Sequence, residues 1–425
     1  LGDVYKRQKP LIIRGARQVG KTWIMKTFGQ QYFEKTAYVN FDNNARMKQV
    51  FEGDLDIERL VLSISAETGV SIEAENTLII FDEVQEVPKA LTSLKYFYEN
   101  APQYAIVAAG SLLGVALHQG TSFPVGKVDF LDLYPLNFRE FLCAMGEKQF
   151  VSMLDSCDTQ MVTVFKTKYI ERLREYYFVG GMPEVVKDFS EKKDYNRVRA
   201  IQKNLINYYQ QDFSKHAEIK LVPRLNLVWN SIPMQLAKEN KKYIYGQVRE
   251  GSRAKDFELA IQWLLDCGLI HKVQRIQKPD LPLKAYIDFD SFKLFLVDIG
   301  LLIAMTDLDA KVIIEGNKIF TEFKGALTEQ YILQQLISDV GVIPYYYSTQ
   351  NSKGEIDFLV QGKTSVIPIE VKAEENLKAK SLKAFCEKYQ PSYAVRTSMS
   401  DYREQDWMTN IPLYAIKWIE NYVNQ

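Results

Sequence analysis

The chain has 425 residues, more than one hydrophobic core usually organises, so two or three domains are expected. Hydrophobic residues make up 47% and charged residues 25% of it, which is ordinary for a globular protein and excludes a low-complexity or disordered class. The 53 basic and 53 acidic side chains cancel, which removes any whole-chain electrostatic argument for nucleic acid but leaves room for a local basic face.

Four scattered cysteines without C-x-x-C spacing and three distant histidines argue against a zinc site and favour reduced thiols. The most apolar stretch, 292–305, contains Lys293 and Asp298 and is shorter than the roughly 20 residues of a membrane-spanning helix. Without a signal-peptide pattern, we expect a cytoplasmic protein with no membrane partner. Residues 1–8 show no helix or strand pattern and begin with Leu1, as a missing natural N-terminus or a gene-model artefact would produce.

The stretch from Gly15 to Thr22 reads G-x-x-x-x-G-K-T, the phosphate-binding loop of P-loop NTPases. An apolar run at 10–14 predicts a strand before it, and helix-compatible residues follow it. In such a loop, backbone N–H groups and a helix N-terminus bind phosphate oxygens. Lys21 would reach the β- and γ-phosphates of ATP, and Thr22 would ligate Mg²⁺. The residues of the predicted loop are Gly15, Ala16, Arg17, Gln18, Val19, Gly20, Lys21 and Thr22. A chance match in a glycine turn is the alternative, disfavoured by the flanking strand and helix.

A second strand is predicted at 36–41 and an amphipathic helix at 55–67. The apolar strand that follows ends in Asp82 and Glu83, at the sheet edge where ligands bind in open α/β folds. Asp82 is the candidate Mg²⁺ ligand, and Glu83 is the candidate general base that polarises the attacking water. By itself this pattern is equally typical of a strand before a solvated turn, but downstream of a P-loop it predicts a nucleotide site.

A helix at 89–100 and a strand at 104–111 come next, and Ser111 ends the strand. Ser111 is a candidate sensor of the γ-phosphate, and a simple turn serine is an equally open reading. A further strand at 127–133 and a helix at 136–145 complete the alternation. Alternating strands and helices predict a parallel sheet with right-handed crossovers.

Together these motifs resemble prokaryotic AAA-superfamily ATPases of a subgroup whose C-terminal domain has no known function. The matching segments are Arg14–Thr22, Ile79–Gln85, Ala109–Ser111, Phe123–Lys127 and Leu133–Phe141. The resemblance implies Mg²⁺-dependent hydrolysis of ATP by an AAA-type P-loop domain. Relatives commonly have arginine where this chain has Lys127, and an arginine there could act on the γ-phosphate, so the role of Lys127 stays open.

The middle of the chain predicts helices at 150–177, 197–213 and 221–239, with a break at Gly180 and Gly181 that serves backbone geometry. A strand-like run at Tyr243–Tyr245, an amphipathic helix at 254–267 and a strand at 269–273 resemble a winged helix. The basic residues of this segment are Arg249, Arg253, Lys255, Lys272 and Arg275. They predict contacts with a DNA backbone, and a packing module with a solvated basic face is the equally open alternative.

Two predicted strands near the C-terminus, 354–360 and 366–372, carry Asp357 on one and Glu370 and Lys372 on the other. Residues two apart on a strand share a face, so Glu370 and Lys372 point toward a site that Asp357 can join. This grouping resembles the restriction-endonuclease-like fold, and Glu329, in a helix at 324–332, matches an additional acid of that fold. The resemblance implies Mg²⁺ bound by Glu329, Asp357 and Glu370, with Lys372 catalytic. An exposed hairpin with alternating charges is the alternative.

The predicted fold class is α/β. We expect an AAA-type P-loop domain with a parallel sheet at 1–146, a helical linker at 147–220, a winged-helix-like domain at 221–305 and a restriction-endonuclease-like α/β domain at 306–425. The predicted function is a Mg²⁺-dependent ATPase, with catalytic Glu83 and Ser111, coupled to a module that binds nucleic acid and is a candidate to cleave it. A DNA-binding ATPase with an inactive nuclease fold and an ATP-driven switch for a protein partner are the alternatives. ATP and Mg²⁺ are the expected ligands, and DNA and a second copy of the chain are candidate partners.

Overall fold

The computed structural model describes residues 9–114, 124, 126–238, 241–315, 321–349, 354–374 and 379–425. The first eight residues therefore lie outside the described residues, as do Phe123 and Val125 of the family pattern. The chain divides into two compact units. One is formed by Leu1–Tyr134 with Gln262–Leu269, and the other by Pro135–Ile261 with Ile270–Gln425.

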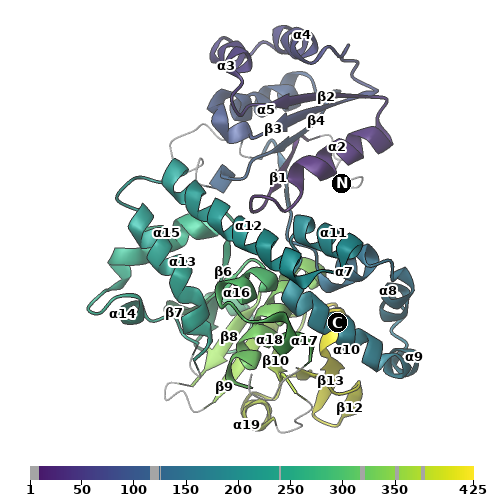
Figure 1. Ribbon diagram of the computed structural model, residues 1–425, viewed down its shortest axis with the longest axis vertical. Helices are drawn as coiled ribbons and strands as arrows, with labels where there is room; N and C mark the ends of the chain where they lie inside the picture. The colour runs from purple at the N-terminus through teal and green to yellow at the C-terminus, as the bar shows by residue number, and fades with distance from the viewer. Residues whose placement is uncertain are drawn as a thin grey trace. The chain divides into compact units, whose positions relative to one another are not determined.

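The first unit is built on a parallel sheet of five strands in the order β2-β3-β4-β1-β5 (Figure 1). The strands are β1 (Leu11–Arg14), β2 (Lys35–Asn40), β3 (Thr77–Asp82), β4 (Ala105–Ala109) and β5 (Asp129–Asp132). The helices are α2 (Lys21–Tyr32), α3 (Ala45–Glu52), α4 (Ile57–Thr68), η1 (Val84–Glu86) and α5 (Pro88–Asn100). This arrangement confirms the predicted α/β fold with a parallel sheet.

Different helices cover the two faces of this sheet, because side chains alternate along each strand. Ile13 packs on one face with Met25 and Phe28 of α2, whereas Ile12 belongs to the core under α3, α4 and α5 on the other face (Figure 1). Strand β3 is buried at every position, as its apolar run predicts for an inner parallel strand. The carboxyl ends of parallel strands meet at one edge, so the loops after β1, β3 and β4 converge there.

The chain continues through a series of helices. They are α7 (Phe138–Ala144), α8 (Lys148–Asp155), α9 (Thr159–Val164), α10 (Lys166–Val179), α11 (Pro183–Lys192), α12 (Tyr195–His216), α13 (Val222–Leu236), α14 (Tyr245–Val248) and α15 (Ala254–Asp266). The predicted helix at 150–177 is divided into α8, α9 and α10, because Asp158 caps a new helix by accepting the N–H of Met161. The strand predicted at Tyr243–Tyr245 is wrong. Tyr245 opens α14, and the ring of Tyr243 stacks on Phe292 with centroids 5.6 Å apart.

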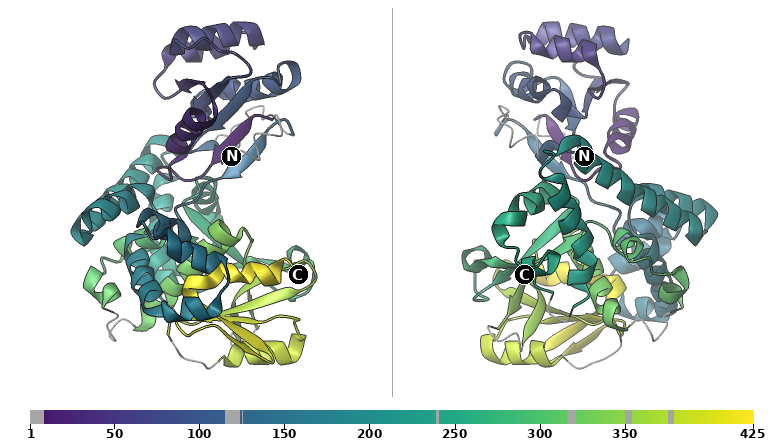
Figure 2. Two further views of the ribbon diagram at one scale, coloured as in Figure 1. Left: turned by 90° about the vertical axis from the view of Figure 1, so that its right-hand side faces the viewer. Right: turned by 60° about the vertical axis from the view of Figure 1, so that its left-hand side comes forward.

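The second unit contains a mixed sheet of eight strands in the order β12-β13-β11-β10-β9-β8-β6-β7, seen from two sides in Figure 2. Its strands are β6 (Ile270–Ile276), β7 (Ile287–Leu296), β8 (Tyr345–Ser348), β9 (Glu355–Gln361), β10 (Val366–Val371), β11 (Val395–Ser398), β12 (Arg403–Gln405) and β13 (Met408–Pro412). The remaining helices are η2 (Leu283–Tyr286), α16 (Ile299–Met305), α17 (Ala310–Ile314), α18 (Thr321–Gln335), η4 (Leu336–Val340), α19 (Lys380–Tyr389), η5 (Leu413–Ile419) and α20 (Glu420–Val423).

The hairpin of β6 and β7 is part of this sheet. Strand β6 pairs in parallel with β8 through Arg275–Tyr346 and Ile276–Tyr347. One sheet therefore runs across the predicted boundary between 305 and 306. The division of this region into a winged-helix-like and a nuclease-like domain stays a prediction.

A buried carboxylate organises the helices of the second unit. Asp298 caps α16 and accepts hydrogen bonds from the N–H groups of Leu301 at 3.1 Å and Gly181 at 2.6 Å. Gly180 has a left-handed φ of 74°, and a Cβ at this position would lie 2.2 Å from Asp298 Oδ1. The glycine pair is therefore needed for close backbone approach, as the sequence predicts. Burial raises the pKa of Asp298 from its ordinary value of 3.8 to about 6, although these hydrogen bonds lower it.

We predict that Asp298→Asn changes how stability depends on pH. The folded-state pKa lies above the unfolded one, so the folded wild type binds more protons between about pH 4 and pH 6 and loses stability as the pH rises through this window. The difference in free energy of unfolding, wild type minus Asp298→Asn, should fall by about 1–3 kcal/mol as the pH rises over that range. Urea unfolding of both proteins at several pH values measures the difference, and a pH-independent difference would contradict the assignment.

Candidate functional site

The loop between β1 and α2 has a backbone suited to an anion. Gln18 and Gly20 have left-handed φ values of 65° and 97°, and Gly20 directly precedes α2. Gly15 has a φ of 144°, and a Cβ there would lie 2.2 Å from the carbonyl oxygen of Leu133, so the position requires glycine. The loop therefore brings the N-terminus of a 12-residue helix, the positive end of its dipole, to the edge of the sheet.

Lys21 is buried inside this loop. Its Nζ donates hydrogen bonds to the carbonyl oxygens of Gly15 and Ala16, each at 2.8 Å. Burial lowers the pKa of Lys21 to about 8, while the nearby carboxylates of Glu83 and Asp82 raise it. A phosphate would give this ammonium a charged acceptor, a stronger partner than a neutral carbonyl.

Thr22 and Asp82 meet at the same sheet edge. The Thr22 hydroxyl donates to Asp82 Oδ2 at 2.6 Å, and the hydroxyl of Tyr38 donates to the same oxygen at 3.0 Å. Asp82 ends β3 and is buried. A hydroxyl and a carboxylate are hard oxygen donors, so Thr22 and Asp82 together fit Mg²⁺. Tyr38 has no counterpart in the predicted site, because its position two residues before the end of β2 carries no motif.

Glu83 lies in a polar network at the end of β3. Its Oε2 accepts hydrogen bonds from Gln85 Nε2 at 2.7 Å and Ser111 Oγ at 3.0 Å. Arg17 Nε in turn donates to Ser111 Oγ at 3.2 Å. Burial raises the pKa of Glu83, but the hydrogen bonds from Gln85 and Ser111 and the charges of Lys21 and Arg17 outweigh it, and the pKa is lowered. Glu83 is therefore ionised at neutral pH, as a general base must be.

The structure thus joins Ser111 to Glu83, and it adds Gln85 and a polar role for Arg17 that the sequence did not predict. Gln85 could have been predicted from its position, because it lies two residues after Glu83 and ends the segment Ile79–Gln85 that resembles the family. Lys127, considered as a replacement for an arginine, pairs instead with Glu99 at 3.0 Å. Arg17 is a second cation of the loop, besides Lys21, that lies near the Glu83 network.

The contacts of the second predicted set fall into two parts. In the first, Glu329 of α18 lies beside Asp357 of β9, and the backbone N–H of Val371 donates to Asp357 Oδ2 at 2.7 Å. Burial and the charge of Glu329 raise the pKa of Asp357 to about 8. The pairing of β8 with β9 shifts register opposite Asp357, and such a bulge re-aims a side chain.

Two lysines enter this first part. Lys293 of β7 is completely buried, with its Nζ 3.7 Å from Glu329 Oε2 and ion-paired with Glu355. Lys241 forms an ion pair with Glu329 Oε1. Burial lowers the pKa of Lys293, but Glu329, Glu355 and Asp357 outweigh it, so the pKa is raised and the lysine is charged. Neither lysine is predicted from the sequence to belong to the site.

The second part consists of Glu370 and Lys372. Lys372 Nζ lies 2.7 Å from Glu370 Oε1, so the two side chains share one side of the strand, as their spacing predicts. Within the described ranges, no group of three or more His, Cys, Asp or Glu side chains is arranged to hold a metal ion. The proposed roles of Glu329, Asp357, Glu370 and Lys372 stay predictions.

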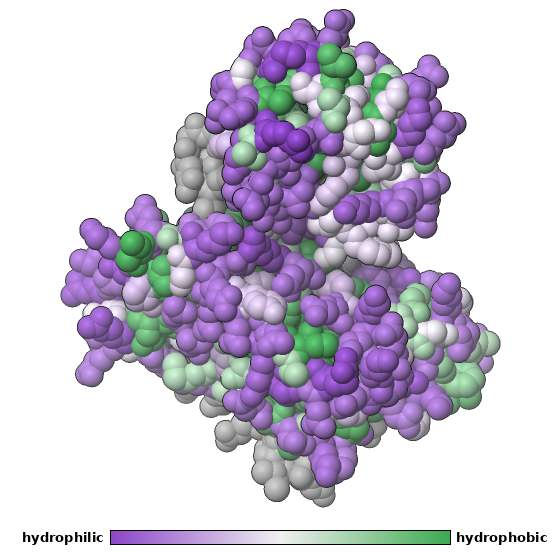
Figure 3. All heavy atoms as spheres, turned by 45° about the horizontal axis from the view of Figure 1, so that its top comes forward, coloured by the Kyte–Doolittle hydropathy of each residue, from purple (hydrophilic) through white to green (hydrophobic). Residues whose placement is uncertain are grey.

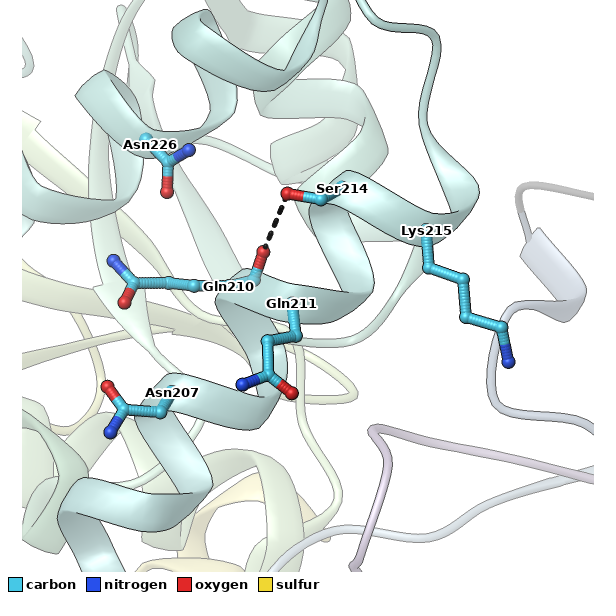
Figure 4. Close-up of a pocket in the computed structure, with 6 residues that line it drawn as sticks. All are labelled: Asn207, Gln210, Gln211, Ser214, Lys215 and Asn226. Atoms are coloured by element: carbon cyan, nitrogen blue, oxygen red, sulfur yellow. Dashed lines mark hydrogen bonds between the residues drawn. The ribbon is translucent and has the colours of Figure 1, made fainter.

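A polar groove of about 690 Å³ opens on the surface of α12 and α13 (Figure 4). The side chains that line it are Asn207, Gln210, Gln211, Ser214, Lys215 and Asn226. Carboxamides both donate and accept hydrogen bonds, so the groove suits a polar ligand. The face of the molecule drawn in Figure 3 is mostly hydrophilic, with hydrophobic residues in small separate areas.

Residues 7–142 match a family model described as an AAA domain. Residues 170–312 and 324–416 match two models described as domains of unknown function, DUF8612 and DUF4143. No curated protein matches the chain. In the described part of the chain, no helix is both long and apolar enough to span a bilayer.

Two similar solved structures are a Walker-type ATPase of Pyrococcus abyssi and the Drosophila ORC bound to DNA. The first is 13% identical, covers 72% of this chain and 93% of its own, and has a TM-score of 0.43. The second is 11% identical, covers 71% of this chain and 89% of its own, and has a TM-score of 0.24. The family match and the loop geometry together identify the N-terminal part of this chain as a P-loop domain of the AAA type.

Proposed function

We propose that the protein is a Mg²⁺-dependent ATPase. The observation that carries the proposal is the convergence of Lys21, the Thr22–Asp82 pair and an ionised Glu83 at one sheet edge. Thr22 and Asp82 would hold Mg²⁺, which when bound offsets the charge of the phosphates. The match of residues 7–142 to an AAA domain supports the same function.

Each side chain of the site has a distinct role in this proposal. Lys21 and the backbone N–H groups of the loop bind the phosphates, which orients the terminal phosphoryl group for attack. Glu83 accepts a proton from the attacking water. Gln85 and Ser111 hold the Glu83 carboxylate in place through the hydrogen bonds at 2.7 and 3.0 Å. Arg17, bonded to Ser111, supplies a positive charge next to the Glu83 network.

We predict that Lys21→Ala lowers ATP turnover by about 100-fold or more, because the phosphates lose their buried ammonium partner. Phosphate release measured with Mg²⁺ and ATP tests this, and circular dichroism checks that the variant is folded. Lys95→Ala is the matched control, since Lys95 is an exposed lysine of α5. Unchanged turnover in a folded Lys21→Ala protein would rule out the ATPase assignment.

We predict that Arg17→Ala lowers kcat by about 10- to 100-fold and changes KM for ATP by less than about 3-fold. The loss falls on kcat because Arg17 acts at the Ser111–Glu83 network, where the chemical step takes place. Lys127→Ala should leave both constants within about 2-fold, because its ammonium pairs with Glu99. The reverse pattern, a loss of kcat in Lys127→Ala alone, would assign the catalytic cation to Lys127 instead.

We further propose that the second unit binds nucleic acid and that ATP hydrolysis is coupled to this binding. The polar groove on α12 and α13 supports the proposal, because carboxamides recognise base edges and Lys215 suits a phosphate. Exposed Arg249, Arg253 and Lys255 in the predicted winged-helix segment support it as well. Cleavage of nucleic acid does not follow from these features, because two acids of the predicted nuclease set, Glu329 and Glu370, are paired with lysines.

We predict that changing Arg249, Arg253 and Lys255 together to alanine weakens DNA binding and makes the slope of log K against log salt shallower. The slope should change by about 0.9 for each DNA phosphate that the variant no longer neutralises. Fluorescence anisotropy with labelled DNA at several salt concentrations measures both the affinity and the slope.

The control for this prediction is a triple change of Lys168, Lys187 and Lys192 to alanine, which removes the same charge from exposed positions on α10 and α11. An equal weakening of DNA binding in both variants would contradict a specific basic face. A wild type that neither binds DNA nor gains ATPase rate from it would favour a protein partner.

A further inference from the structure

We propose that Lys241 and Lys293 take the place of a divalent cation in the nuclease-like set, so that Glu329 and Asp357 belong to a metal-free ionic cluster. The cluster is defined here as Lys241, Lys293, Glu329, Glu355 and Asp357. It is independent of the nucleotide site, and the proposal does not rest on ATPase activity.

The cluster joins four segments of the second unit. Lys293 comes from β7, Glu329 from α18, Asp357 from β9 and Lys241 from the segment before α14. The side chains of Lys293, Glu329 and Lys241 are 0%, 6% and 14% exposed. The Lys293 ammonium also lies 4.8 Å from the ring centroid of Tyr346, which belongs to β8, the strand next to β6. With carboxylates and a ring around it, and no exposed surface, Lys293 is held in the cluster.

The balance of charge does not fit an added Mg²⁺. The raised pKa of Asp357 keeps this carboxyl protonated at neutral pH, so the two lysines balance the carboxylates of Glu329 and Glu355. A divalent ion would add two positive charges to a buried site that is already balanced and already holds two ammonium groups. Uncompensated charge is costly in a buried site, and like charges at a few ångströms repel strongly there. The residues present therefore do not fit a bound divalent cation.

One observation favours a metal instead. Glu329 Oε2 and Glu370 Oε2 are buried and have no hydrogen-bond partner, and such oxygens are the type that coordinate Mg²⁺. Each of these carboxylates nevertheless has an ammonium beside it, Lys293 at 3.7 Å from Glu329 and Lys372 at 2.7 Å from Glu370. The neighbouring ammonium groups supply the compensating charge that a cation would otherwise bring.

The consequence is a structural role for residues that resemble a catalytic set. The lysines tie β7 and the segment before α14 to α18 and β9, across the boundary where the sequence predicts two separate domains. Removing one partner of a buried ion pair leaves the other charged and unpaired, which is strongly destabilising. A metal ion bound in place of the lysine would offset that cost, and this difference can be measured.

The test uses the full chain without nucleotide, carrying Asp82→Asn so that the carboxylate at the end of β3, the candidate Mg²⁺ ligand of the first unit, does not contribute a metal signal. Melting temperature is recorded in EDTA and in Mn²⁺ for this background and for the background with Lys293→Met. We expect Mn²⁺ to leave the background unchanged and to raise the melting temperature of the Lys293→Met protein by several degrees. A rise of the same size in the background, abolished by Asp357→Asn, would overturn the proposal.

A second measurement applies even if Lys293→Met does not fold. Binding of Mn²⁺ to the Asp82→Asn background, in which Lys293 is unchanged, is followed by electron paramagnetic resonance. We expect that adding Asp357→Asn does not reduce the amount of bound Mn²⁺. A bound Mn²⁺ ion that disappears in Asp357→Asn would contradict the proposal.

In the variants that fold, Lys293→Met should melt several degrees lower than the background, and adding Glu355→Gln should recover part of that difference. Lys383→Met, which removes an exposed lysine of α19 outside the cluster, is the matched control. Equal melting temperatures of Lys293→Met and its background would also contradict the proposal.

Discussion

The hydrogen bond between Thr22 and Asp82 is the contact on which the proposed nucleotide site depends. It joins the start of α2 to the end of β3, although β4 lies between β3 and the strand β1 that leads into α2. The parallel sheet makes this contact possible, because it gathers the ends of its strands at one edge. The left-handed residues Gln18, Gly20 and Glu83 then turn the chain so that side chains face the same space. The chemistry of the site follows from that backbone.

In the second unit, the types and the spacing of the residues do not by themselves determine the chemistry of the site. Asp357, Glu370 and Lys372 have the spacing of a metal-dependent nuclease, and β9 and β10 pair as that spacing requires. The function of such residues nevertheless depends on what else lies beside them. Here Lys241 and Lys293 bring two positive charges from outside the motif, and we propose that they turn a candidate metal site into an ion-paired core. The ATPase domain and the second unit therefore differ in how far their motifs predict their chemistry.

The sequence predicted the first unit well because its signals are local. The P-loop motif occupies eight consecutive residues, and Asp82 and Glu83 end a single apolar strand, so the roles proposed for both follow from short-range rules. Lys293 could not be predicted in the same way. In the sequence it interrupts an apolar run, and its partner Glu355 is 62 residues further along the chain. The pairing of β6 with β8 brings the two near each other, and strand register across such distances has no local signal.

Local propensity also failed where tertiary contacts decide the conformation. The run Tyr243–Tyr245 has strand-forming residues, but the Tyr243 N–H bonds to the carbonyl of Phe292 and the chain then enters α14. The role of Arg17 was hidden for a related reason. Its position in the P-loop is variable in the motif, and its contact with Ser111 requires β1 and β4 to be neighbours.

We propose that Glu83 activates water at a site that binds ATP through other residues. Glu83→Gln keeps the size and the polar contacts of the side chain but removes its ability to accept a proton, so it separates binding from hydrolysis. Nucleotide affinity and the rate of phosphate release should be measured on the same preparation of this variant. The account predicts affinity within about 3-fold of wild type and phosphate release slowed by about 100-fold or more. Phosphate release at the wild-type rate by a Glu83→Gln protein that binds ATP normally would contradict it.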